Sequence, residues 1–184
     1  MKLLLPHPDT LSLWRKIIHE AEAVCSVTLT EILESHLAHL LFRYTNKPEL
    51  AKQILALEFL NGVDLPPHQR ETALQEVGDK CLLVSGLFPK LAEKRHVKIG
   101  YFVNLGRSAY SSISHNEEDF YDNLSRYFVP MMDTLQSIRH YSSEFPDLLP
   151  LDAYELWHET GSQRALKTLQ IYTRATPISI KKLL

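Results

Sequence analysis

The chain has 184 residues, of which 45% are hydrophobic and 23% charged, and its formal net charge is −2. This composition is typical of a folded globular protein and excludes an intrinsically disordered chain. Two cysteines are too few for the disulfide framework of a small secreted protein. No apolar run is long enough to span a membrane, and Pro6, His7 and Asp9 end the leucine-rich start too early for a signal sequence. We therefore expect a cytoplasmic protein that does not enter membranes.

Charge alternates in sign along the chain. Residues 1–88 carry a net −3, 89–116 carry +4, 117–159 carry −8 and 160–184 carry +5. We expect such neighbouring segments to pair with one another inside the fold. Because the whole chain is close to neutral, the composition disfavours nucleic-acid binding.

Apolar residues recur at helical spacing along most of the chain, and glycine, proline and capping residues divide it into segments. The sequence predicts an all-α bundle of eight or nine helices, at about residues 9–25, 28–45, 46–62, 66–86, 90–95, 99–113, 116–142, 152–160 and 165–172. We expect residues 1–176 to form a single all-helical domain. Residues 177–184 form a basic C-terminal tail.

Boundary residues carry the most specific local signals. Proline cannot donate an N–H and clashes with the preceding helical turn, so Pro130 predicts a kink in the long helix at 116–142. Polar residues at five helix starts are the predicted N-caps: Asp9, Thr28, Asn46, Asn116 and Asp152.

Residues 99–113 form the helix around which we expect the others to pack. Gly106 lies in the middle of its apolar side, where the absence of a side chain lets a second helix come close. Residues 97–105 also alternate as a strand does, but the chain has no convincing partner strand. The pattern therefore favours a helix.

A polar row flanks that apolar side and is the candidate ligand-binding site: Tyr101, Asn104, Arg107, Ser108 and Ser111. The alternative is an ordinary solvated shoulder of the helix. We expect Arg107 to pair with a carboxylate in the acidic stretch 117–122, and binding of an external anion is the other possibility.

Two Glu-x-x-His pairs have the spacing found in di-iron helical bundles, Glu93 with His96 and Glu155 with His158. Glu34 and Glu58 are candidates for the two further carboxylates that such a site needs. This spacing arises often by chance, and lysines surround the first pair.

His36 and His39 are a second weak metal candidate, three residues apart on one helix. His36 lies inside an apolar stripe, which favours a core histidine whose ring nitrogens find partners. We expect no metal and no cofactor.

Large apolar residues surround the predicted kink in greater number than one helix face needs: Phe120, Tyr127, Phe128, Met131 and Met132. This surplus predicts a homodimer or a protein partner.

The run from Gly86 to Pro89, followed by Glu93, Arg95 and the stretch from Gly100 to Tyr110, resembles a family of uncharacterised small bacterial proteins. The resemblance covers most of the chain and implies no activity, so no functional residue is carried over. We expect an interaction or regulatory role rather than an enzyme. The alternative is a helical enzyme or a binder of small anions or metals, using the polar row or the Glu-x-x-His pairs.

Overall fold

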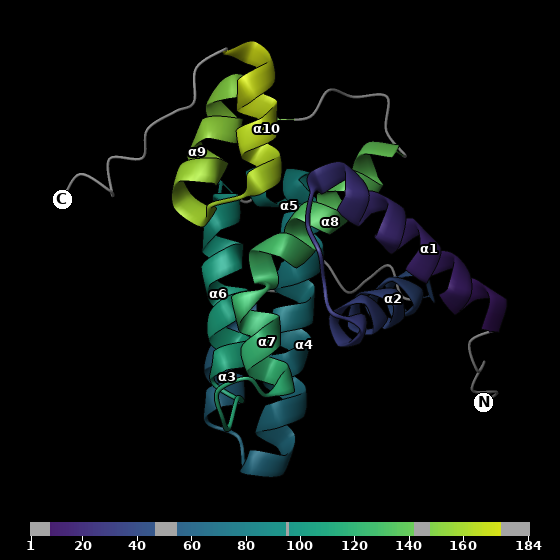
Figure 1. The fold of residues 1–184 in the computed structure, drawn as a ribbon. Helices are drawn as coiled ribbons and strands as arrows, with labels where there is room; N and C mark the ends of the chain where they lie inside the picture. Colours follow the sequence, from purple (N-terminus) through teal and green to yellow (C-terminus); the bar gives the residue numbers. More distant parts are fainter. Residues whose placement is uncertain (1–7, 47–54, 95, 142–147, 174–184) are drawn as a thin grey trace.

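The computed structural model describes residues 8–46, 55–94, 96–141 and 148–173. Within these ranges every regular element is a helix (Figure 1). The prediction of an all-α, single-domain fold is confirmed. The helices are α1 (Pro8–Cys25), α2 (Glu31–Asn46), α3 (Leu55–Val63), α4 (Pro67–Gly86), α5 (Pro89–Lys94), α6 (Ile99–Ser111), α7 (Phe120–Arg126), α8 (Phe128–Tyr141), α9 (Pro150–Thr160) and α10 (Gln163–Tyr172).

Helices α4 and α6 lie side by side and form the centre of the molecule (Figure 1). Every residue of α4 from Val77 to Gly86 is buried, as expected for a helix surrounded by others. Helices α1 and α2 pack together on one side of this centre, and α1 also contacts α8. Helices α9 and α10 form a pair that contacts the central helices through α6 and α8.

Two glycines allow aromatic rings to lie directly against the central helices. A Cβ on Gly78 of α4 would lie 2.4 Å from the Tyr110 ring, and a Cβ on Gly106 of α6 would lie 2.4 Å from the Phe128 ring. Neither contact leaves room for a methyl group. The expectation that Gly106 lets a neighbouring helix come close is confirmed, as is the choice of helix over strand for this segment.

The predicted kink is a break between α7 and α8, and it lies at Tyr127 rather than at Pro130. Pro130 thereby falls in the first turn of α8, where a missing N–H costs nothing because the first N–H groups of a helix have no partner inside the helix. Ten segments are helical in the described residues, and they number nine if α7 and α8 are taken as one broken helix.

Several helix starts differ from the predicted caps. Helix α2 begins at Glu31 rather than after Thr28. Helix α7 is capped by Asp119, whose carboxylate accepts the Asp122 N–H, and not by Asn116. Asp152 lies in the first turn of α9, which begins at Pro150. The predicted cap at Asn46 belongs to a helix start outside the described residues, as does the tail at 177–184.

The apolar residues around the break belong mainly to the core. Phe128, Met131 and Met132 are fully buried and Tyr127 is partly buried, whereas Phe120 is 36% exposed. The apolar surplus that predicted a partner surface is therefore used inside the fold. None of the described helices combines the length and the hydrophobicity that crossing a membrane requires.

A contact between oppositely charged segments joins α9 to the start of α6. Lys98 lies 3.1 Å from a carboxylate oxygen of Glu155 and 3.5 Å from one of Glu159. This contact joins the basic stretch at 89–116 to the acidic stretch at 117–159, as the charge pattern predicted.

Candidate functional site

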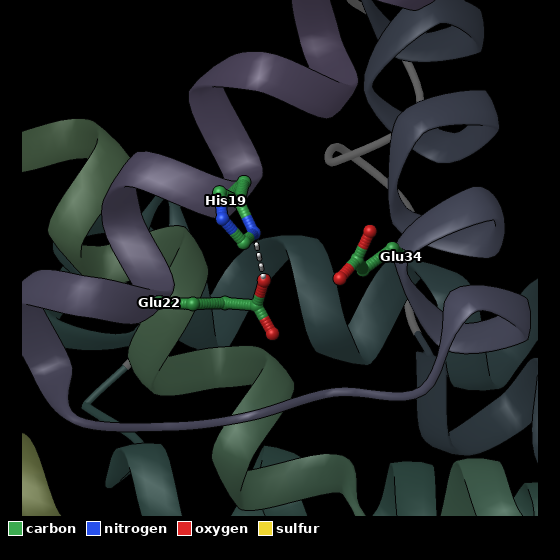
Figure 2. A group of neighbouring side chains, drawn as sticks. All are labelled: His19, Glu22 and Glu34. Atoms are coloured by element: carbon green, nitrogen blue, oxygen red, sulfur yellow. Dashed lines mark ion pairs between the residues drawn. The ribbon is translucent and has the colours of Figure 1, made fainter.

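A histidine and two glutamates meet where α1 faces α2. His19 and Glu22 stand three residues apart on α1, and Glu34 faces them from α2 (Figure 2). One ligand-type atom from each side chain lies within 4.8 Å of the other two. Among the residues that the structure describes, this is the only group of three or more potential metal ligands with that spacing.

Glu22 is held in place by the loop that joins α1 to α2. Its Oε1 accepts the Leu29 N–H at 2.5 Å, and its backbone carbonyl accepts the Val27 N–H at 3.1 Å. Ser26 turns the chain with a positive φ of 56°. Because Oε1 serves the loop, Oε2 is the oxygen that approaches His19, at 3.7 Å from Nδ1.

The electrostatic setting of Glu22 is unfavourable for an isolated carboxylate. The residue is only 4% exposed. Burial raises the pKa of Glu22, and the negative charge of Glu34 raises it further, while the Leu29 N–H and His19 act in the opposite direction. A cation bound between the two carboxylates would offset their mutual repulsion.

The three side chains suit a divalent transition-metal ion. An imidazole nitrogen with two carboxylate oxygens is a donor set used by zinc, iron and manganese. His19 is 82% exposed, so its ring can rotate toward the glutamates and the site opens to solvent. Three protein ligands leave coordination positions for water or for a ligand from outside.

The sequence reasoning had identified Glu34 but not His19 or Glu22. A signal for them existed, because Glu22 interrupts an apolar stripe formed by Ile18, Ala21 and Cys25, all buried. A glutamate in such a stripe needs a partner, and His19 lies one turn before it.

The polar row on α6 lies on the surface. Asn104, Arg107, Ser108 and Ser111 line a shallow depression, and the adjacent Ser125 donates its hydroxyl to the Arg107 carbonyl at 3.1 Å. Tyr101, 44% exposed, lies on the same helix outside that lining. The row therefore exists as a surface feature, and its ligand stays a prediction.

The expected internal partner of Arg107 is not found. Within the described residues Arg107 forms no ion pair, because Asp119 accepts backbone N–H groups and Asp122 pairs with Arg126 at 2.9 Å.

The Glu-x-x-His residues do not assemble with Glu34 and Glu58 into one site. Glu58 pairs with Lys80 at 2.8 Å, and Glu155 pairs with Lys98. His158 stacks on Tyr154, with ring centroids 5.8 Å apart. His96, at a positive φ of 52°, lines the same pocket as Glu155, and the side chain of Glu93 lies outside the described residues.

His36 and His39 point to different partners. His39 Nδ1 lies 2.7 Å from the Ser35 carbonyl, whereas His36 Nε2 lies 3.0 Å from Asp79 Oδ1, close enough for an ion pair though poorly aligned for a hydrogen bond. His36 is partly buried, and its ring faces Asp79 on one side and a surface depression on the other.

Asp79 is the centre of a buried polar network that joins α2, α4 and α6. Its carboxylate accepts the Tyr110 hydroxyl at 2.7 Å and a guanidinium N–H of Arg43, in addition to the His36 contact. Burial alone raises the pKa of Asp79, but His36, Arg43 and Tyr110 outweigh burial and hold it below its ordinary value. Asp79 is therefore ionised at neutral pH.

Comparison of the chain with protein-family models, with curated proteins and with solved structures finds no match. The resemblance to small bacterial proteins accordingly stays a prediction.

Proposed function

We propose that the protein binds a divalent transition-metal ion through His19, Glu22 and Glu34, and that it has a regulatory or interaction role rather than an enzymatic one. The observation that carries this proposal is the pairing of buried Glu22 with a second carboxylate across the α1–α2 interface. The two carboxylates repel each other, and a dication bound between them attracts both, so the ion would make this arrangement favourable.

A role in interaction is supported by the open side of the site. His19 projects into solvent, so a donor atom from another molecule can complete the coordination sphere. The ion would also tie α1 to α2, two helices that the loop at 26–30 joins. Metal supply would thereby control how firmly α1 is held against α2.

We also place the protein in the cytoplasm. Cys25 and Cys81 are both free and buried, which is compatible with a reducing compartment. We also propose that the protein forms a homodimer or binds a protein partner. The support for this is the open metal site, because the apolar residues that first suggested a partner lie mainly in the core.

Metal binding is tested on the full-length protein after treatment with a chelator. Zinc is added in calorimetric and thermal-melting titrations, and manganese and nickel are added in parallel. We expect one zinc ion per chain and a stability gain of about 2.7 kcal/mol when free zinc is 100 times its Kd.

Variants of single residues test whether the zinc ion binds at this site. Glu34→Gln removes one ligand without changing the shape of the side chain and should abolish the zinc-induced rise in Tm. Glu20→Gln is the matched control, because it removes the same charge from an exposed position next to His19. Absence of zinc binding at millimolar concentration, or equal binding by Glu34→Gln and wild type, would reject the proposal.

A further inference from the structure

A second feature, separate from the metal ligands, surrounds His36. One edge of its ring faces Asp79, and the residue lines a surface depression of about 410 Å³. The remaining lining comes from both sides of the α1–α2 contact and from the start of α7: Arg15, Glu31, Ile32, Ser35, His39 and Phe120. That volume lies within the range of small-molecule sites.

Asp79 and two aromatic rings surround the ring of His36. Its Nε2 lies 3.0 Å from Oδ1 of Asp79, which is 2% exposed, so this edge of the imidazole faces the interior of the fold. Phe120 packs edge-on against the imidazole at a centroid distance of 5.6 Å, and Tyr110 does so at 6.4 Å. His36 also lines the depression, so part of its ring borders the space that a ligand would occupy.

Arg15 supplies a hydrogen-bond donor to the depression. Its Nη2 donates to Ser35 Oγ at 3.1 Å, and none of its nitrogens lies in an ion pair with a described carboxylate. A guanidinium held at one nitrogen still presents further N–H groups to an anion. His39 adds another imidazole, and Glu31 is the single acidic residue in the lining.

Two lining residues, which we call the apolar wall, are hydrophobic and reachable from solvent. Ile32 is 65% exposed and Phe120 is 36% exposed. A large aliphatic side chain and an aromatic ring therefore line the same depression as a guanidinium and an imidazole. This combination fits a ligand that carries one negative group and one apolar group.

We propose that the depression around His36 binds a small organic carboxylate with an aromatic or branched apolar side group. The carboxylate accepts N–H groups of Arg15 beside the His36 ring, and the apolar group covers Ile32 and Phe120. Inorganic phosphate can accept the same hydrogen bonds but makes no apolar contact with Ile32 and Phe120, so it binds less tightly. The proposal is independent of the metal site, whose ligands lie outside this lining.

Phenylacetate is the probe, titrated into the full-length protein and followed by calorimetry and by NMR of the histidine rings. We expect shifts of the His36 and His39 ring signals, and at least tenfold weaker binding in Arg15→Gln. Lys16→Gln is the matched control, an exposed basic residue next in sequence and outside the depression. Glu34→Gln should bind phenylacetate as wild type does, which separates this site from the metal site.

Ile32→Glu tests the apolar wall at a position exposed enough to tolerate the change. It should weaken phenylacetate binding at least tenfold and leave the melting temperature nearly unchanged. No ring shifts at millimolar phenylacetate, or binding unaffected by Arg15→Gln, would overturn the site. Phosphate that binds as tightly as phenylacetate, with no loss in Ile32→Glu, would overturn the assignment of an apolar carboxylate.

Discussion

Two buried carboxylates in this protein have opposite surroundings. Asp79, between α2, α4 and α6, receives a guanidinium, an imidazole and a hydroxyl, so its pKa falls despite burial. Burial raises the pKa of Glu22, between α1 and α2, and Glu34 adds to the rise, while the Leu29 N–H offsets only part of it. Burial acts in the same direction on both residues, and only Asp79 has neighbours that outweigh it.

The two carboxylates differ in whether the protein itself balances their charge, and an unbalanced pair is the one able to bind a cation. The Asp79 network satisfies its charge with its own side chains, so it serves to hold three helices together. Glu22 and Glu34 have only His19 as a balancing group among the described residues. We therefore expect the first region to govern stability and the second to respond to ions.

The largest expected effect follows removal of the buried charge at Asp79. Asp79→Asn leaves Arg43 and His36 without their counter-ion and should lower the free energy of unfolding by about 3 kcal/mol. Asp64→Asn, at an exposed loop position, is the control and should stay within about 0.5 kcal/mol of wild type. Urea unfolding at pH 7 measures both. Equal stability of the two variants would contradict the assigned role of the network.

The same variant has a defined pH dependence. Since the pKa of Asp79 is lowered on folding, its contribution is fully present above the unfolded value of about 3.8 and is lost as pH falls through the folded pKa. The stability difference between wild type and Asp79→Asn should therefore shrink as the pH is lowered below about 4.

A smaller effect is expected from crowding the ring that donates to Asp79. In Gly78→Ala the new methyl group would lie 2.4 Å from the ring of Tyr110, which is fully buried. Overpacking costs about 1–3 kcal/mol, and the better helix propensity of alanine returns up to about 1 kcal/mol. We expect a net loss of stability in thermal unfolding. Thr72→Ala, exposed on the same helix, is the control, and a Gly78→Ala protein more stable than wild type would show that Tyr110 can move.

The smallest effect is expected at the unbalanced pair, and it has the opposite sign. Without metal, Glu34→Gln removes a repulsive charge from Glu22 and should raise stability by about 0.5 kcal/mol at pH 7. Because the pKa of Glu22 is raised on folding, its ionisation costs stability as pH rises from about 4.5 through the folded pKa. The gain should therefore vanish near pH 4. A gain of the same size at pH 4 and pH 7, or the same gain in Glu20→Gln, would contradict the carboxylate pairing.

The locations of the helices could be predicted because their signals are local. Apolar spacing marked α4, α6 and α8, and Pro67 and Gly86 fixed both ends of α4. Helix caps were less predictable, since several polar residues in one loop can serve as the cap. Asp119 takes that role at α7 because its carboxylate also reaches the N–H groups of His115 and Asn116.

The candidate sites were less predictable than the helices, because charges at distant positions in sequence make them. His36 was identified as a partnered core histidine, but nothing local connects it with Asp79. Glu34 was a candidate ligand for the wrong partners, since its neighbours are His19 and Glu22 rather than the Glu-x-x-His pairs.

The sequence by itself determined the fold class, the segments that become helices and the need for a glycine at position 106, because helical period, proline and glycine act through the nearest few residues. Only the tertiary structure decided which charges meet. The packing of α2 against α4 brings Arg43 and His36 to Asp79, and the packing of α1 on α2 gives Glu22 a second carboxylate. The interaction of two charges depends on their distance in space and on the solvent around them, and the local sequence pattern specifies neither.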